Sequence, residues 1–337
     1  MFKGFGVRLA LGATVAVLSA GMLAACGGGE QVEKFVPTRI VSFGDENSAI
    51  VDINGDRNGA KYNVNALKAP ATTGGVSTTL DCLTNPVWNE YVATSFSLVF
   101  PECNPNAVAT TSRNLSALNA RASGTSNSVQ AQIDTFLSTD SFNEKTLVTV
   151  MAGHWDVRAQ YDAVAAGTTS ADAAVANVEA AGSALAEQVN RIAALGGKVL
   201  ISTIPDVGTM PFGIAQETAS PGRAALLTQL TNRFNAKLRV GLINDGTKIG
   251  LVLGDEAVSA NVKAAGVTFA DVTRAACDPI AAPTLLQCTT NTLLKDATGT
   301  VIASGDSWLW SDAEHLSAGG QRLVGNLAAS RAVGNPF

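Results

Sequence analysis

The sequence predicts an α/β fold in which a parallel sheet is covered by helices on both faces. Short, continuous apolar runs alternate with longer segments whose apolar residues recur at helical spacing. Glu46, His154 and Asp206 each come just after one of the apolar runs. Because parallel sheets bind ligands beyond the carboxyl ends of their strands, this repeated placement indicates a functional site at that edge.

In the first half of the chain, a strand is predicted at residues 39–43, from the run Ile-Val-Ser-Phe. Residues 54–112 are rich in Gly, Asn, Thr and Ala, so we expect an irregular excursion there with one short helix near residues 87–95. Apolar residues at i, i+4, i+7 and i+8 from Val129 predict a further helix. The apolar run at residues 147–152 predicts the next strand.

The second half continues the alternation. A long amphipathic helix is predicted at residues 175–195, and Gly196-Gly197 ends it in the usual way for a helix C-terminus. A strand at residues 198–204, a helix at residues 226–238 and a strand at residues 249–253 follow. The result is a single large α/β domain, since no charged or proline-rich linker divides the chain after about residue 35.

Residues 1–25 are predicted to be a signal peptide. Lys3 and Arg8 precede a short apolar stretch, and Leu23-Ala24-Ala25-Cys26 matches the lipobox of a bacterial lipoprotein. The sequence therefore predicts that Cys26 carries a lipid, that residues 26–36 are a lipidated tether, and that residues 37–337 form the domain. The expected location is the bacterial cell envelope, at the outer membrane or the periplasmic face. An uncleaved anchor and a soluble secreted protein are the alternatives.

The charge balance argues against nucleic acid as a partner. Without Lys3 and Arg8, the 23 Lys and Arg residues fall to 21 against 28 Asp and Glu, which leaves a net charge of −7. Proteins that bind nucleic acid need basic patches. The membrane, through the lipid, is the partner that the sequence predicts.

Four cysteines remain after Cys26, an even number for an oxidising compartment. Sequence alone allows three pairings, and we predict the local one, Cys82 with Cys103 and Cys277 with Cys288. Each bond would close a short loop and contribute about 2–4 kcal/mol of stability. Zinc binding is not predicted, because no CxxC pair or nearby histidine is present.

Two short motifs, one near each end of the chain, carry the chemistry. Phe43-Gly44-Asp45-Glu46 opens a polar turn after the first predicted strand, and Asp312 stands three residues before His315. The chain has only two histidines, His154 and His315. The combination predicts a hydrolase site assembled from both ends of the chain, with a carboxylate where a serine is expected.

These motifs belong to a longer series, and the chain resembles the GDSL, or SGNH, hydrolases from about residue 39 to residue 329. Their order and spacing match the blocks of that family. The matching segments are FGDE at 43–46 (family FGDS), NPVWNEY at 85–91 (NGPVWVEY), 119–125 (second block), GHWD at 153–156 (GxND), FNAKL at 234–238 (FNxxL) and DAEH at 312–315 (DxxH).

The resemblance implies a three-layer α/β/α, flavodoxin-like fold and hydrolysis of carboxylic esters in small-molecule or lipid substrates. It implies a nucleophile at position 46, His315 as its base and Asp312 as the residue that orients the histidine. It also implies oxyanion donors at the backbone of position 46, at Gly124 and at position 155. No cofactor is expected.

The chain departs from the family at two positions, with Glu46 in place of the serine and Trp155 in place of the GxND asparagine. Ser48 lies two residues past the nucleophile position and is not predicted to replace it. Loss of one oxyanion donor typically costs about 100- to 1,000-fold in rate. Loss of the hydroxyl removes the acyl-enzyme route altogether.

Three interpretations follow. In the leading one, Glu46 and His315 deprotonate a water that attacks the ester, with His154 as an oxyanion donor. In the second, the protein is a catalytically inactive relative that binds acyl or glycan ligands. In the third, these residues bind a metal together with Asp156, but no tight ligand spacing supports this and no metal is predicted.

Each of these residues also has a structural alternative. Glu46 would suit the N-terminus of a helix, where a negative charge is favourable. His154 would fill a turn, and Trp155 would form part of the core or a wall of the cleft.

Overall fold

The computed structural model describes residues 34–73 and 75–334, and the folded unit within them begins at Phe35. The predicted signal peptide, Cys26 and most of the predicted tether lie outside the described residues. No helix in the described part of the chain is both long enough and apolar enough to span a bilayer.

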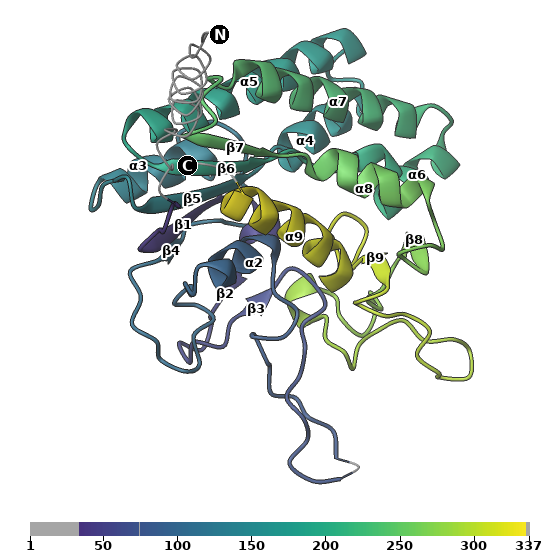
Figure 1. The fold of residues 1–337 in the computed structure, drawn as a ribbon. Helices are drawn as coiled ribbons and strands as arrows, with labels where there is room; N and C mark the ends of the chain where they lie inside the picture. Colours follow the sequence, from purple (N-terminus) through teal and green to yellow (C-terminus); the bar gives the residue numbers. More distant parts are fainter. Residues whose placement is uncertain (1–33, 74, 335–337) are drawn as a thin grey trace, which may run out of the picture. The chain divides into compact units, whose positions relative to one another are not determined.

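Five parallel strands form the central sheet, which confirms the predicted fold class (Figure 1). Their order, β4-β1-β5-β6-β7, places the second strand of the sheet outside the first, as in flavodoxin-like folds. The strands are β1 (Arg39–Gly44), β4 (Arg113–Asn114), β5 (Thr146–Met151), β6 (Lys198–Ser202) and β7 (Ile249–Val252). Gly44 pairs with Met151, so β1 and β5 end side by side.

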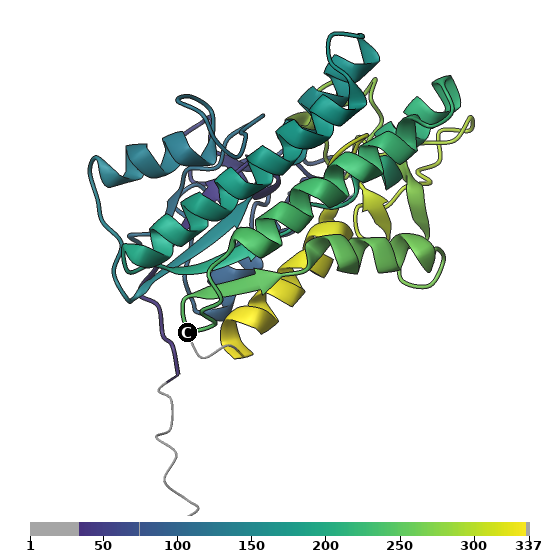
Figure 2. The same cartoon turned by 90° about the horizontal axis from the view of Figure 1, so that it is seen from above.

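Helices cover both faces of the sheet (Figure 1). On one face lie α3 (Val129–Leu137), α4 (His154–Ala165), α5 (Ala171–Ala194) and α7 (Arg223–Gly241). On the other lie α2 (Trp88–Ser95), α8 (Gly254–Lys263) and α9 (Ala318–Gly334). Figure 2 shows α5 and α7 side by side over the sheet, with α6 (Pro211–Ala219) preceding α7.

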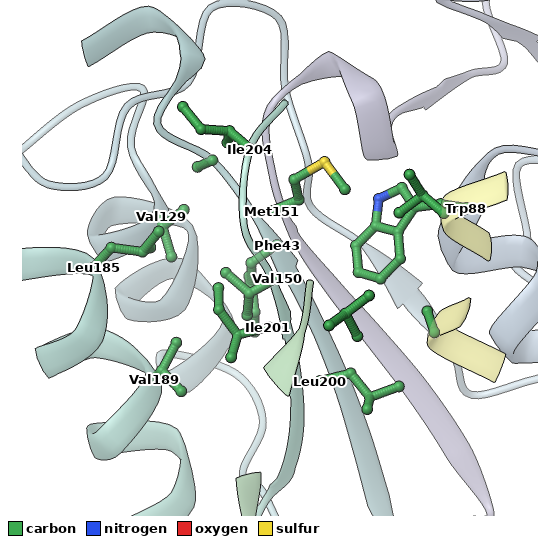
Figure 3. Packing of buried hydrophobic residues seen from close by; sticks show 14 of the residues in the cluster. Phe43, Trp88, Val129, Val150, Met151, Leu185, Val189, Leu200, Ile201 and Ile204 are labelled. Atoms are coloured by element: carbon green, nitrogen blue, oxygen red, sulfur yellow. The ribbon is translucent and has the colours of Figure 1, made fainter. Parts of the chain in front are cut away.

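The core therefore has two halves, one on each side of the sheet. Figure 3 shows Leu185 and Val189 of α5 on one side and Trp88 of α2 on the other. All three side chains are fully buried. The strands between them are buried in almost every position because both of their faces are covered.

Two long excursions leave the sheet: the first lies between β1 and β4, and the second lies between α8 and α9. A second, smaller core joins them. It contains Val64 from the first excursion and Cys277, Cys288 and Trp308 from the second. Most of the remaining short elements lie in these excursions: β2 (Ile50–Val51), β3 (Ala60–Lys61), β8 (Asp271–Ala275), β9 (Trp308–Trp310) and the 3₁₀ turns Glu46–Ser48 and Leu285–Gln287. The 3₁₀ turn Val207–Thr209 lies between β6 and α6.

Both predicted disulfides are present, Cys82–Cys103 in the first excursion and Cys277–Cys288 in the second. The local pairing is thereby confirmed. Asn65 connects the two excursions, because its backbone amide and its side chain both donate to the carbonyl of Cys288. This connection fixes the first excursion beside the second one.

Candidate active site

The two ends of the chain meet at the carboxyl edge of the sheet. Glu46 follows β1 in the turn Glu46–Ser48, and His154 begins α4 directly after β5. His315 lies in the loop between β9 and α9. The structure brings Glu46, Asp312 and His315 into direct contact, although 269 residues separate Glu46 from His315.

Two glycines shape the turns that carry these residues. Gly44 has a φ of 142°, and a Cβ there would lie 2.0 Å from the carbonyl oxygen of Met151. Gly153 has a φ of 129°, and a Cβ there would lie 2.3 Å from the ring of Phe234. A side chain is therefore excluded at both positions. Gln132 of α3 clamps the first turn, since its amide bonds both the N–H and the C=O of Gly44.

Asp312 and His315 form the pair that the DxxH spacing predicts. The Nδ1 atom of His315 lies 2.9 Å from each carboxylate oxygen of Asp312. The backbone amide of His315 also donates to Asp312 Oδ1, at 2.8 Å. On the other side of the ring, Nε2 lies 2.8 Å from Glu46 Oε1. The imidazole is held between two carboxylates.

Glu46 accepts two further hydrogen bonds. The indole Nε1 of Trp155 donates to Oε1 at 2.6 Å, and the backbone amide of Asn119 donates to Oε2 at 2.9 Å. The Glu46 side chain has no exposed surface. Asn119 has a φ of 60°, a left-handed conformation that asparagine tolerates better than most residues.

The two carboxylates favour the protonated form of His315. Burial on its own would lower the pKa of His315, but the charge of Asp312 and the hydrogen bonds to Asp312 and Glu46 hold that pKa well above its usual value. Burial opposes the ionisation of Glu46 and Asp312 as well, yet their contacts with His315 lower both pKa values. The three residues form a carboxylate–imidazole–carboxylate network in which Glu46 is fully buried and Asp312 is partly exposed.

Asp45 and Asp156 have raised pKa values, in contrast to Glu46 and Asp312. Burial, helped by the charge of Glu46, raises the pKa of Asp45 to about 7. Its Oδ1 accepts from the backbone of Asn47, while Oδ2 is buried without a hydrogen-bond partner among the described residues. Burial also raises the pKa of Asp156 to about 6, and Asp156 accepts from the amide of Ala122.

Trp155 and His154 both lie near the network, but they contact different carboxylates. Trp155 reaches Glu46, but as a donor to a carboxylate rather than to an oxyanion. His154 is buried, and its Nε2 lies 3.3 Å from Glu314 Oε1, because α4 directs this first residue toward the loop before α9. Its ring packs edge-on against Trp155.

Gly124 is not brought to the site. It is exposed at the start of the segment leading into α3, and its amide donates to Gln130. The backbone donor that reaches Glu46 belongs to Asn119, five residues earlier. Sequence reasoning missed this residue because a backbone N–H leaves no side-chain signal, although an asparagine in a polar turn is a common choice for positive φ.

Ser48 contacts the core, and the acidic and histidine side chains of the site are not arranged as metal ligands in the described residues. Ser48 is fully buried, and its hydroxyl accepts from the indole of Trp88, so it is not available as a nucleophile. Within residues 34–73 and 75–334, no group of three or more His, Cys, Asp or Glu side chains is arranged to hold a metal ion. Both ring nitrogens of His315 already face carboxylates.

No family model matches the chain, and no curated protein matches it in sequence. Among solved structures, an acetylxylan esterase from Geobacillus stearothermophilus matches with a TM-score of 0.41 and 11% identity, over 89% of this chain and 96% of that one. Phospholipase A1 from Streptomyces albidoflavus NA297 matches with a TM-score of 0.42 and 14% identity, over 88% and 99%.

A third structure, an α/β hydrolase enzyme from the metagenome of Lake Arreo in Spain, has a TM-score of 0.40 and 14% identity, over 88% of this chain and 95% of that one. Similarities at this level establish neither the family nor the activity of this chain.

Proposed function

We propose that this chain is a lipid-anchored protein of the bacterial cell envelope, of the SGNH-hydrolase type, that binds a small-molecule or lipid ligand without hydrolysing it. The contact between Glu46 and His315 carries this proposal. A carboxylate occupies the position where the sequence resemblance implies a serine, and it pairs with the histidine that would otherwise act as the base.

The network lacks both parts of a serine-type reaction. No hydroxyl is present at position 46 to form an acyl-enzyme. The two carboxylates raise the pKa of His315 and favour its protonated form, in which the imidazolium has no free lone pair with which to accept a proton. Trp155 replaces the family asparagine and directs its N–H to Glu46, so it does not supply an oxyanion donor in this arrangement.

Direct hydrolysis by an activated water is the second candidate, and the hydrogen-bond distance between Glu46 and His315 favours it. Such a route needs a water in contact with an unoccupied carboxylate lone pair. Glu46 already accepts three hydrogen bonds, from His315, Trp155 and Asn119, and its side chain has no exposed surface through which a water could reach the acceptor position that remains. The geometry therefore supports binding over hydrolysis.

One measurement distinguishes the two candidate functions, ligand binding and water-mediated hydrolysis. A soluble form that begins after Cys26 would be assayed on p-nitrophenyl esters of short and medium acyl chains, beside its His315→Ala variant. Equal rates for the two proteins are expected if the site is silent. A rate that exceeds the background and is lost in His315→Ala would replace this proposal with water-mediated ester hydrolysis.

A further inference from the structure

The partners of Glu46 differ in how easily they could leave it. His315 is buried and is held from behind by Asp312, and Asn119 contributes a backbone amide. Trp155 is a half-buried side chain in the first turn of α4. Rotation of this one side chain would free a lone pair of Glu46 Oε1 without moving a strand of the sheet.

The chemistry of Glu46 limits what could take the place of the indole. An ionised carboxylate only accepts hydrogen bonds, and the indole N–H that it now binds is a donor. A carbonyl oxygen or an anionic headgroup would bring negative charge against the carboxylate. A hydroxyl group could donate to it as the indole does.

The surrounding charges favour a neutral ligand. His315 is already balanced between Glu46 and Asp312, and Glu314 is paired with Arg158. An additional buried charge would have no partner left among these groups, and burying an unpaired charge is costly.

A second half-buried aromatic residue lies beside the network. The ring centre of Tyr62 lies 6.3 Å from that of His315, on the side of the first excursion. Burial and the nearby Glu46 raise the pKa of Tyr62, so its phenol remains a neutral hydrogen-bonding group. Tyr62 and Trp155 each present an apolar ring with a polar atom, which suits a ligand with ring faces and hydroxyls.

We propose that Trp155 closes a hydroxyl-binding site, and that a neutral, hydroxyl-rich ligand of the oligosaccharide class binds by displacing the indole from Glu46. This inference rests on the proposed binding function and narrows its ligand class from small molecules and lipids to glycans. The closed indole lowers the apparent affinity, since only the fraction of molecules with an open site can bind.

The direct test is NMR of the intact folded unit titrated with neutral oligosaccharides (maltotriose, xylotriose and chitotriose) and with octanoate as the acyl probe. A bound sugar is expected to shift the Trp155 indole N–H and to increase its exchange with water. The indoles of Trp88 and Trp310 are internal references, because they donate to Ser48 and to the carbonyl of Val272 inside the core. Their signals should not move.

Variants give a second, independent measurement by calorimetry. Trp155→Phe keeps an aromatic ring beside His154 and removes the N–H, so sugar affinity should rise about tenfold or more as the closing hydrogen bond is lost. Trp308→Phe makes the same chemical change in a tryptophan that does not contact Glu46 and should have no effect. Adding Glu46→Gln to Trp155→Phe should reverse the gain by about tenfold, because hydrogen bonds to a charged acceptor are the stronger ones. Circular dichroism would show that each variant is folded.

Three results would overturn the inference: no sugar binding by the folded wild type and Trp155→Phe at millimolar concentration, binding of octanoate but not of sugars, or sugar binding that leaves the Trp155 N–H unchanged. The ester assay keeps the proposed function separate. Turnover lost in His315→Ala refutes the silent site whatever the sugars do. A silent protein that binds no sugar refutes only the glycan inference.

Discussion

At the scale of single residues, Glu46 decides what His315 can do. In a serine triad the histidine stays neutral until it takes the proton of the hydroxyl. Here a second carboxylate faces Nε2 at 2.8 Å and stabilises the imidazolium before any substrate is present. The same Asp312–His315 pair that would support catalysis instead completes an ion network.

Replacing Glu46 with serine should therefore change the protonation of His315. With one anionic partner removed, the pKa of His315 should fall toward its usual value, and Glu46→Ser should gain ester hydrolysis above the wild-type level. Adding Trp155→Asn should increase the rate by about 100-fold or more, because it restores a side-chain donor for the oxyanion. An NMR titration follows the histidine directly, since the chain has only two.

The control for this gain is His315→Ala in each background, which should abolish it. If Glu46→Ser and Glu46→Ser/Trp155→Asn both remain at the rate of their His315→Ala counterparts while folded, the interpretation of the network as an altered triad is wrong.

Asp45 makes a different, pH-dependent prediction. Its folded pKa of about 7 lies above the unfolded value of 3.8, so the folded state binds the proton more tightly. The stabilisation from this proton is complete below about pH 4 and is lost as the pH rises to about 7. Asp45→Asn cannot ionise and keeps the contact with Asn47, so it should be more stable than wild type at pH 8 by a few kcal/mol, the free energy that corresponds to a pKa shift of this size.

Urea unfolding at pH 4.5 and at pH 8 measures this difference. Glu46 and His154 act electrostatically on Asp45, and both are present in the two proteins, so their contributions largely cancel. A stability difference that is the same at both pH values would contradict the buried, protonated Asp45.

The sequence predicted the residues whose side chains carry chemistry better than it predicted their partners. Glu46, Asp312 and His315 were identified from two motifs, and the structure brings them together. The donor from Asn119 and the contact of His154 with Glu314 could not be read, because they depend on backbone direction and on the angle at which α4 begins.

At the scale of elements, periodicity identified the buried strands and missed several helices. β1, β5, β6 and β7 lie where continuous apolar runs predicted them, to within two residues. α9 was not predicted, because glycine is a poor helix former. A Cβ at Gly319 would lie 2.0 Å from the carbonyl oxygen of Asp306, and one at Gly325 would lie 2.4 Å from the ring of Tyr91. These glycines permit close packing, which local sequence patterns do not reveal.

Gly153 lies in the turn that leads into α4 and so determines where His154 and Trp155 are placed. Gly153→Ala would place a methyl group 2.3 Å from the Phe234 ring at a positive φ, and should destabilise the fold by about 2–4 kcal/mol. Gly167→Ala is the matched control, because Gly167 also has a positive φ but open space around it, and should cost only about 1 kcal/mol. Chemical denaturation compares the two, and equal losses would mean that the contact with Phe234 does not constrain the turn.

At the scale of the whole molecule, the strand order explains why residues from both ends of the chain form one site. β1 lies next to β5 in the sheet, and the 3₁₀ turn after β1 also contacts α2, which packs against the C-terminal α9. The loop before α9 is thereby carried to the end of β1. Hydrophobic patterning predicted the layers, whereas the pairing of the two excursions through Asn65 and Cys288 arises only in the folded chain.

The predicted attachment of this domain to a membrane depends on one residue. Cys26→Ser should abolish metabolic incorporation of an alkyne-tagged fatty acid, because lipid attachment requires the thiol of the lipobox cysteine. Cys82→Ser removes a cysteine of the folded domain instead, and should leave labelling intact even if it weakens the fold through loss of the bond to Cys103. Mass spectrometry of the wild type should find a lipidated N-terminal residue at position 26. Labelling that persists in Cys26→Ser would place the lipid on another residue, and a mature chain that starts elsewhere without lipid would refute the predicted attachment to a membrane.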